Sequence, residues 1–301
     1  MRRPMSSCLL LLAACGAQLS GGTADPGGPP GRLDAGASDA VLDALQLGPW
    51  STPAPVGVAA TIASDEDDVT LSSDALELIF AIAGTAGAGK ELYYTSRAAI
   101  GAAWSKPAPL PFNTPAASEE APRFSGDDLT LYFASDRVTA GDLDVYGVTR
   151  SAPGSNTTWD MPRPIAAVRT TASEKWFAPC ANGRYVVVRS VAGNGTDLLE
   201  GTLTGGDPAP IVALDTTSNE TGAFLTQDCT TIYFTSDRVK PRRIFVSHRA
   251  AIGMPWQPPT QVDDFKLPAG VQEDPWLSPD GRTFALASNA AGTSDIYLST
   301  R

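Results

Sequence analysis

The sequence repeats itself with a period of about 50 residues, and this repetition limits the possible folds more than any other feature. Residues 131–137 read Leu-Tyr-Phe-Ala-Ser-Asp-Arg, and residues 232–238 read Ile-Tyr-Phe-Thr-Ser-Asp-Arg. A second strand-like run ends in arginine, and its clear copies are 91–97, 144–150, 243–249 and 295–301. Such self-similarity indicates repeated structural units rather than unrelated domains.

A tryptophan followed closely by proline opens the next unit, at Trp50, Trp104, Trp159 and Trp256. The first three tryptophans are 54 and 55 residues apart, and the last interval of 97 residues fits two units, one without its tryptophan. Turn residues such as Asp, Asn and Gly precede the first long strand of each unit. Four short strands per unit, repeated five times, predict an all-β fold with a single β-propeller over residues 46–301. Six blades are the alternative.

The two ends of the repeat region complement each other. The last unit stops at residue 301 after its third strand, whereas residues 50–58 form an outer strand with no inner strands before it. Pairing of these two segments would complete the fifth blade and leave no open sheet edge there. We therefore expect the N-terminal strand to close the ring.

Several of these motifs resemble a known repeat. Ser-Pro-Asp-Gly at 278–281, Tyr-Phe-x-Ser-Asp-Arg at 132–137 and 233–238, and Asp-Ile-Tyr at 295–297 are similar to the WD40-like repeat of the TolB-type β-propeller family. The resemblance covers roughly residues 50–301. It implies a propeller fold and says little about molecular activity. The recurring Ser-Asp-Arg and Asp-x-Tyr residues are interpreted as structural, because a single active site would use residues that break the repeat.

The N-terminus predicts a bacterial lipoprotein. Two arginines, four leucines and Leu-Ala-Ala-Cys up to Cys15 resemble a lipobox. Residues 1–14 would then be a signal peptide, with lipid attached to Cys15. Residues 15–45, rich in Gly and Pro, would form a flexible lipid-anchored tether. Gly16 after the cysteine favours the outer membrane, facing the periplasm or the cell surface.

Charge and composition exclude some functions. The chain has 33 acidic and 22 basic side chains, a net charge of −11, which argues against nucleic-acid binding. His248 is the single histidine, so a polyhistidine metal site is excluded. The predicted function is non-catalytic binding of an envelope protein or polysaccharide by a monomer without a cofactor. A glycan hydrolase of the five-bladed kind is the alternative.

An acidic residue recurs where each innermost strand is expected to begin, at Asp67, Glu120, Glu174, Glu220 and Glu273. These side chains would converge on one mouth of the central channel. They could bind a divalent cation or a basic peptide there, or they could be solvated strand ends. A glycosidase needs two carboxyl groups in different environments, which equivalent acids would not provide.

Two further groups of residues stand out. Lys240, Arg242 and Arg243 form a basic patch in one unit only, and it is a candidate partner site. Cys180 and Cys229 lie near matching turns of neighbouring units. In an oxidising periplasm they could form a disulfide, and two buried thiols are the alternative.

Overall fold

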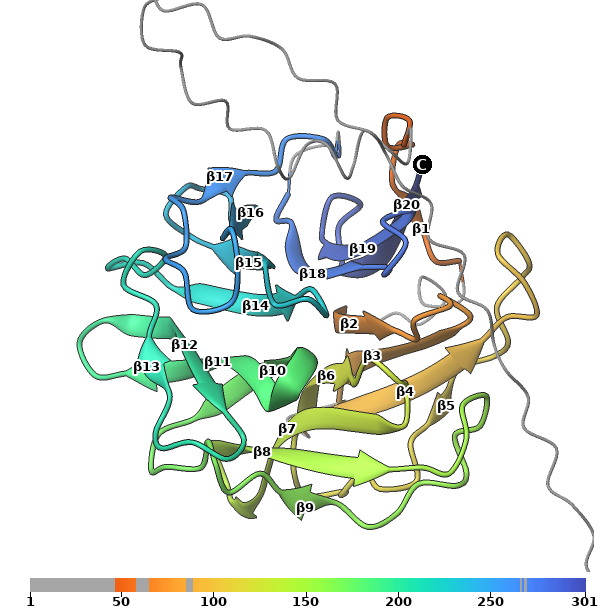
Figure 1. Ribbon diagram of the computed structural model, residues 1–301. Coiled ribbons are helices and arrows are strands. Elements are labelled where there is room, and N and C mark those ends of the chain that lie inside the picture. Colours follow the sequence, from red (N-terminus) through yellow and green to blue (C-terminus); the bar gives the residue numbers. More distant parts are fainter. Residues whose placement is uncertain (1–46, 58–64, 85–88, 266, 268–269) are drawn as a thin grey trace, which may run out of the picture.

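The computed structural model describes residues 47–57, 65–84, 89–265, 267 and 270–301. Five four-stranded antiparallel sheets surround a central axis (Figure 1), which confirms the predicted five-bladed propeller. The predicted signal peptide 1–14, Cys15 and the tether 15–45 lie outside the described residues. No helix in the described ranges is long and apolar enough to cross a membrane.

The blades follow one another along the chain, each from its inner to its outer strand. Blade 1 contains β2 (Glu66–Leu71), β3 (Glu77–Ala83), β4 (Lys90–Ser96) and β5 (Ala108–Pro109). Blade 2 contains β6 (Glu119–Phe124), β7 (Thr130–Thr139), β8 (Asp142–Thr149) and β9 (Arg163–Pro164). Blade 3 contains β10 (Glu174–Pro179), β11 (Arg184–Val191), β12 (Gly195–Thr202) and β13 (Ala209–Pro210), with the short helix η3 (Ala181–Gly183). Blade 4 contains β14 (Glu220–Leu225), β15 (Thr231–Ser236), β16 (Arg243–His248) and β17 (Thr260–Gln261).

Blade 5 joins the two ends of the propeller. It contains β18 (Glu273–Leu277), β19 (Thr283–Ser288), β20 (Asp295–Thr300) and, as its outer strand, β1 (Ala54–Pro55). The backbone N–H of Ser51 donates to Thr300 O at 2.8 Å, and that of Val56 donates to Ile296 O at 2.8 Å. The expected closure by the N-terminal strand is therefore confirmed.

A stacked arginine–tryptophan pair recurs at the outer strands. The distances from guanidinium carbon to ring centroid are 4.4 Å for Arg97–Trp104, 4.7 Å for Arg150–Trp159, 4.3 Å for Arg249–Trp256 and 4.2 Å for Arg301–Trp50. Each such cation–π contact contributes about 0.5–2 kcal/mol. The last pair joins residues from the two ends of the chain, so it reinforces the closure of the ring.

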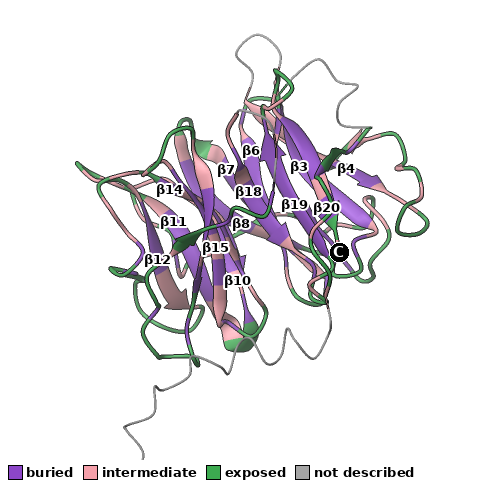
Figure 2. Cartoon of the chain, turned by 90° about the horizontal axis from the view of Figure 1, so that it is seen from above, coloured by how far each residue is buried: buried purple, intermediate pink, exposed green. Residues whose placement is uncertain are grey.

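The core lies between neighbouring sheets. The second strand of every blade carries one fully buried aromatic side chain, and these are Phe80, Phe133, Tyr185, Phe234 and Phe284. Seen from the side, the strands are mostly buried and the connecting loops carry most of the exposed residues (Figure 2). The loops at the two ends of the channel are therefore the parts of the repeat that are accessible to a ligand.

Candidate functional site

The five inner strands share a local irregularity that sets the environment of each side chain at the channel. The strand register shifts after the second residue of β2, β6, β10 and β14, and after the first residue of β18. The residue that follows has positive φ in each case, at Asp68, Ala121, Trp176, Gly222 and Asp274. Such a bulge re-aims neighbouring side chains. Successive residues at the start of these strands therefore have different surroundings.

The five acids expected at one mouth occupy two different positions. Glu174 and Glu220 are the first residues of their strands and are fully buried. Glu174 pairs with Arg189 at 2.9 Å, and Glu220 pairs with Arg238 at 2.9 Å. In blade 2 the equivalent residue is Glu119. These ion pairs lie inside single blades, so Glu174 and Glu220 brace the strands and are not presented to a ligand.

The recurring Ser-Asp-Arg residues complete this bracing, as the sequence predicts. The hydroxyl of Ser236 donates to Glu220 at 2.8 Å, and that of Ser135 donates to Glu119 at 3.0 Å. The aspartate of the motif accepts a backbone hydrogen bond from the chain before the inner strand, as Asp237 does from Asn219 N at 2.8 Å. The motif is therefore structural.

Asp67 and Glu120 lie at the second position of their strands, and Glu273, the first residue of β18, has the same place next to the bulge. All three lie around the end of the channel where the inner strands start. We call this end the strand-start mouth. Lys90 Nζ lies 2.6 Å from Asp67 Oδ2 and 3.8 Å from Glu120 Oε2. Lys175 occupies the second position of blade 3, and its Nζ lies 2.9 Å from Glu120 Oε2. Asp67 and Glu120 are thus paired with lysines of the same protein.

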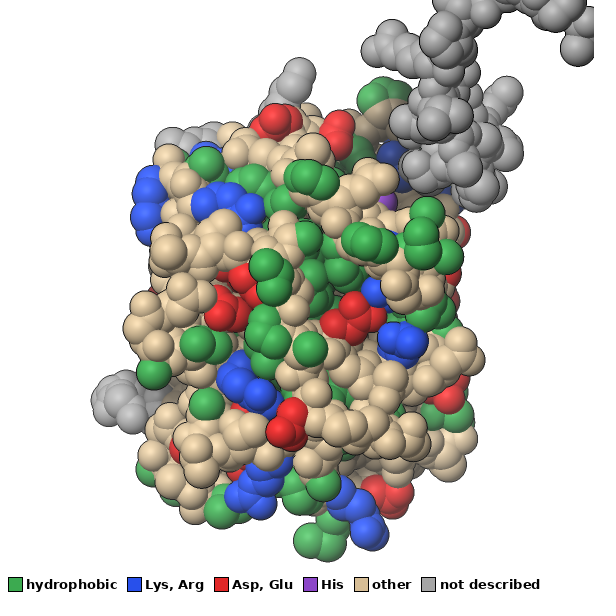
Figure 3. Space-filling model, turned by 60° about the vertical axis from the view of Figure 1, so that its left-hand side comes forward, with side chains coloured by type: hydrophobic (Ala, Val, Ile, Leu, Met, Phe, Trp, Pro, Cys, Tyr) green, Lys and Arg blue, Asp and Glu red, His purple; other side chains and the backbone are tan. Residues whose placement is uncertain are grey.

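The predicted basic patch is divided by the structure, and one member joins this mouth. Arg242 Nη1 lies 2.7 Å from Glu273 Oε2. Lys240 pairs with Asp237 at 2.8 Å, and Arg243 Nη1 donates to Gly270 O at 2.6 Å. On the face that Figure 3 shows, basic side chains lie in small groups among acidic and apolar ones. Nucleic-acid phosphates are bound by basic side chains that cluster on one surface, which differs from the small groups seen on this face.

Deeper in the channel lie two buried carboxyl groups that the sequence argument missed. The backbone N–H of Asp68 donates to Asp274 Oδ2 at 3.0 Å, and Trp176 Nε1 donates to Asp68 Oδ1 at 2.9 Å. Burial alone would raise the pKa of Asp68, but the ammonium groups of Lys90 and Lys175 outweigh it and lower this pKa. Burial and the charge of Asp68 raise the pKa of Asp274 well above its usual range. The pairs of consecutive acidic residues at 67–68 and 273–274 were the sequence feature that could have indicated these two groups.

Arg123 spans the channel below these carboxyl groups. Its guanidinium donates to the carbonyl oxygens of Ala223 and Pro275 at 3.1 Å each, and also to Val69 O. The donor belongs to blade 2 and the acceptors to blades 4, 5 and 1, so one side chain connects four blades. Burial lowers the pKa of Arg123 to about 10, although the charges of Asp274 and Asp68 act to raise it.

A cavity of about 440 Å³ opens at the opposite end of the channel. We call this end the turn mouth, because the turns that follow the inner strands surround it. Arg123, Phe224 and Trp276 line the cavity from the fifth or fourth residue of their inner strands, and Tyr233 adds a third aromatic ring. Phe224 contacts Trp276 and Tyr233, with centroid distances of 6.4 and 6.5 Å. These side chains differ between blades, so the cavity departs from the repeat.

Exposed carboxylates stand in the turns of this mouth, at Asp74, Asp127, Asp228 and Asp280. Asp228 and Asp280 line the cavity itself, and Asp74 and Asp127 directly follow the lining residues Ser73 and Gly126. We call them the acidic rim. In each turn a Ser or Thr hydroxyl two residues earlier donates to the aspartate at 2.6 Å. The sequence pattern had shown the turns, but it did not show that these turns surround one opening.

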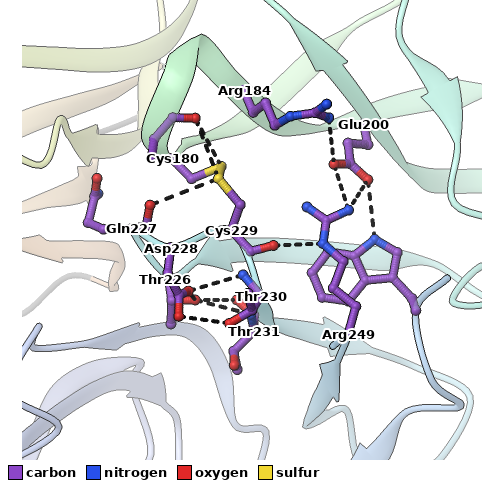
Figure 4. Close-up of a disulfide and its surroundings, with 12 residues drawn as sticks. Cys180, Arg184, Glu200, Thr226, Gln227, Asp228, Cys229, Thr230, Thr231 and Arg249 are labelled. Carbon is purple, nitrogen blue, oxygen red and sulfur yellow. Dashed lines mark hydrogen bonds and ion pairs between the residues drawn. A yellow bond between two sulfur atoms is a disulfide. The ribbon is translucent and has the colours of Figure 1, made fainter. Parts of the chain in front are cut away.

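A disulfide ties two of these turns together. The Sγ atoms of Cys180 and Cys229 are 2.01 Å apart, and the bond links blade 3 to blade 4 (Figure 4). Ala181 N also donates to Gln227 O at 2.9 Å. Because Gln227 lines the cavity, the disulfide fixes one side of the turn mouth.

One carboxylate group outside the channel could hold a cation. Within the described part of the chain, oxygens of Asp197, Asp215 and Glu220 lie within 4.8 Å of one another. Blade 2 has Arg169 where blade 3 has Asp215, and Arg169 pairs with Asp144 at 3.0 Å. Burial raises the pKa of Asp215 to about 7. Oxygen ligands of this kind suit calcium.

Glu66 is the blade 1 counterpart of the braced glutamates, but no arginine pairs with it. It is fully buried, and neither carboxyl oxygen accepts a hydrogen bond from the described residues. Burial and the neighbouring Asp295 raise the pKa of Glu66 to about 8. The folded protein therefore holds a proton there that the unfolded chain has released.

This proton predicts a dependence of stability on pH. Between the usual pKa of 4.5 and the raised value of about 8, the free energy of unfolding should fall as pH rises, because the folded state binds more protons. Urea denaturation from about pH 5 to about pH 8 measures this slope. Glu66→Gln should make the slope shallower, whereas Asp263→Asn on the surface should not. Equal slopes in the native protein and Glu66→Gln would contradict the assignment.

Comparison with known proteins supports the fold. No protein-family model and no curated protein matches the chain. An endo-arabinase of Bacteroides thetaiotaomicron is 11% identical, with a TM-score of 0.57, over 83% of this chain and 97% of that one. The GH62 α-L-arabinofuranosidase domain of Coprinopsis cinerea is 13% identical, with a TM-score of 0.55, over 84% and 97%. A TolB-type protein of Agrobacterium tumefaciens is 16% identical, with a TM-score of 0.50, over 79% and 77%.

These similarities are structural and distant. The chain is a five-bladed propeller whose fold resembles those of TolB, an endo-arabinase and an α-L-arabinofuranosidase. At such low identity the likeness concerns the fold, and fold alone does not assign function.

Proposed function

We propose that this protein is a non-catalytic binding protein of the bacterial cell envelope, anchored by lipid at Cys15. Its ligand would be a protein or a polymer, held at the turn mouth. The observation that carries the proposal is the 440 Å³ cavity there, lined by aromatic side chains that break the repeat. Concave, mostly apolar sites with a few polar groups are the usual form of ligand sites.

The strand-start mouth supports binding less well. Its carboxylates Asp67, Glu120 and Glu273 already pair with Lys90, Lys175 and Arg242. A cationic ligand would have to displace these internal partners before it could bind. For this reason we place the ligand at the turn mouth, and we retain the strand-start acids as part of the channel's internal ion-pair network.

A hydrolase is the second candidate, and one observation favours it. The pKa of Asp68 is lowered and that of Asp274 is raised, which is the division between base and acid that glycosidases use. However, Asp68 is only 2% and Asp274 only 4% exposed. Both are therefore shielded from a substrate, and we assign their opposite shifts to the packing of charges in the channel.

A cavity-blocking variant tests the binding proposal. Gln227 is exposed and lines the cavity, so Gln227→Trp should obstruct the opening. The full chain is screened against peptide and envelope-glycan arrays. We expect the native protein to bind a ligand of these arrays and Gln227→Trp to lower the affinity at least about tenfold. A tenfold change corresponds to a loss of about 1.4 kcal/mol of binding free energy. Val212→Trp, at a side chain 84% exposed and outside the cavity lining, should bind as the native protein does.

The same samples test the alternative. Release of sugars from arabinan, xylan or peptidoglycan, abolished by Asp68→Asn or Asp274→Asn, would overturn the binding proposal in favour of hydrolysis. Ligand binding that is equal in Gln227→Trp and Val212→Trp would overturn the placement at the turn mouth.

A further inference from the structure

We propose that the turn mouth binds a basic peptide segment, with one apolar side chain in the cavity and lysine or arginine side chains against the acidic rim. This inference rests on the proposed function, which it narrows to one ligand class. Two features of the same opening carry it: the aromatic cavity and the charge around it.

The cavity is suited to an apolar group rather than to a charge. Phe224, Trp276 and Tyr233 present ring surface to it. Arg123 also lies at the cavity, but only 3% of this residue is exposed. Its guanidinium donates to three carbonyl oxygens. The charge of Arg123 is balanced from within the channel by Asp68 and Asp274. The nitrogens of Arg123 are therefore engaged within the channel, and aromatic rings form a large part of the cavity wall.

The rim has the opposite character. Its four aspartates come from blades 1, 2, 4 and 5, and all four are exposed. Oδ1 of each accepts the hydroxyl hydrogen bond of its own turn. The carboxylates are thus held in place before a ligand arrives, which lowers the entropic cost of binding. The turn hydrogen bonds also lower the pKa of Asp127, and they outweigh burial in lowering that of Asp228.

Basic residues near the rim do not cancel this charge. Arg301 is stacked on Trp50 and donates to Gly281 O at 2.8 Å. Arg282 is near Asp280, with 4.0 Å between Nε and Oδ2, and its side chain is 57% exposed. Arg97 also lies beside the rim, because its guanidinium donates to Ala75 O, next to Asp74, at 3.0 and 2.8 Å. Four carboxylates against these three guanidinium groups leave the opening with a net negative charge. A basic peptide complements that charge, and its approach would be accelerated by electrostatic attraction.

Three short peptides test the contributions of the cavity and of the acidic rim separately. The probes are Lys-Lys-Leu-Lys-Lys, Lys-Lys-Gly-Lys-Lys and Glu-Glu-Leu-Glu-Glu, with xylotriose as a neutral sugar, titrated calorimetrically into the full chain. We expect the leucine-containing basic peptide to bind about tenfold more tightly than the glycine peptide, because only the former buries an apolar side chain. Raising the salt concentration from about 0.02 M to about 0.5 M should weaken its binding several-fold, since exposed charges are then screened.

Charge-neutralising variants localise the binding. Asp228→Asn and Asp280→Asn should each weaken binding of the basic leucine peptide several-fold. Asp263→Asn removes an exposed carboxylate outside the rim and should leave binding unchanged. Melting temperatures of all variants show whether a loss of binding reflects a loss of fold, and Gln227→Trp provides a second block of the same opening.

The outcomes distinguish this inference from the proposed function. Binding of xylotriose that Gln227→Trp abolishes, without binding of the basic peptides, would overturn the inference and keep the binding function. Equal binding of the acidic and basic peptides, or no binding of Lys-Lys-Leu-Lys-Lys at low salt, would also overturn it. Sugar release from the glycans of the function screen would instead overturn the proposed function itself.

Discussion

Deletion of residues 1–57 is expected to lower the free energy of unfolding by about 5 kcal/mol, whereas deletion of residues 1–46 should change it little. The longer deletion removes β1 and Trp50, which packs on Phe265 and Phe284 with centroid distances of 5.6 and 5.8 Å. Trp50 is partly buried, and loss of a large aromatic side chain from packed surroundings costs up to about 3–5 kcal/mol. Val56, which is 3% exposed, and the strand hydrogen bonds add to this loss.

Thermal unfolding of the two truncated proteins measures the difference. For a domain of this size, about 1 kcal/mol shifts the melting temperature by about 2–4 °C, so a difference of at least about 10 °C is expected. The exposed edge of β20 should also promote association, because unpaired strand edges pair with other chains. Equal melting temperatures and equal sedimentation of the two proteins would show that the N-terminal strand contributes nothing to closure.

Replacement of Arg123 is expected to have the second large effect. In Arg123→Ala the carbonyl oxygens that accept its hydrogen bonds lose a buried donor, and Asp68 loses a nearby positive charge. Breaking a buried charge interaction by removing one partner costs about 3–5 kcal/mol. We therefore expect a loss of that size in the free energy of unfolding, measured by urea denaturation.

An exposed arginine provides the matched control. Arg163 in β9 is exposed, so Arg163→Ala should change stability by less than about 0.5 kcal/mol. Arg123→Lys keeps the charge but cannot reach three acceptors with one planar group, and we expect it to recover only part of the loss. If Arg123→Ala were as stable as Arg163→Ala, the role of Arg123 as a connection between blades would be wrong.

The candidate sites show where prediction from sequence failed. The acids 67, 120, 174, 220 and 273 look equivalent because each begins a similar strand. Glu174 and Glu220 stand one residue farther from the bulge than the other three acids, and they are internal partners of Arg189 and Arg238. A shift of one residue in a strand turns a side chain to another environment. The sequence shows the repeat but not this register.

Charge compensation was equally hidden. Lys90 begins β4 of blade 1 and Lys175 stands in β10 of blade 3, yet both ammonium groups approach Glu120 of blade 2. Arg242 was grouped with Lys240 by sequence proximity, but its guanidinium meets Glu273 of the next blade. Contacts between blades depend on how the sheets are arranged around the axis, and spacing along the chain does not contain that information.

The sequence by itself determined the architecture of this protein. The period of the repeat, the turn residues and the unpaired strand at each end specify five four-stranded blades and their closure, because strand alternation and turn chemistry are local properties. The tertiary structure decided which end of the channel is open. Arg123, Phe224, Trp276 and the turn aspartates are distant in sequence, and they form an acidic-rimmed cavity only because ring closure brings their blades together.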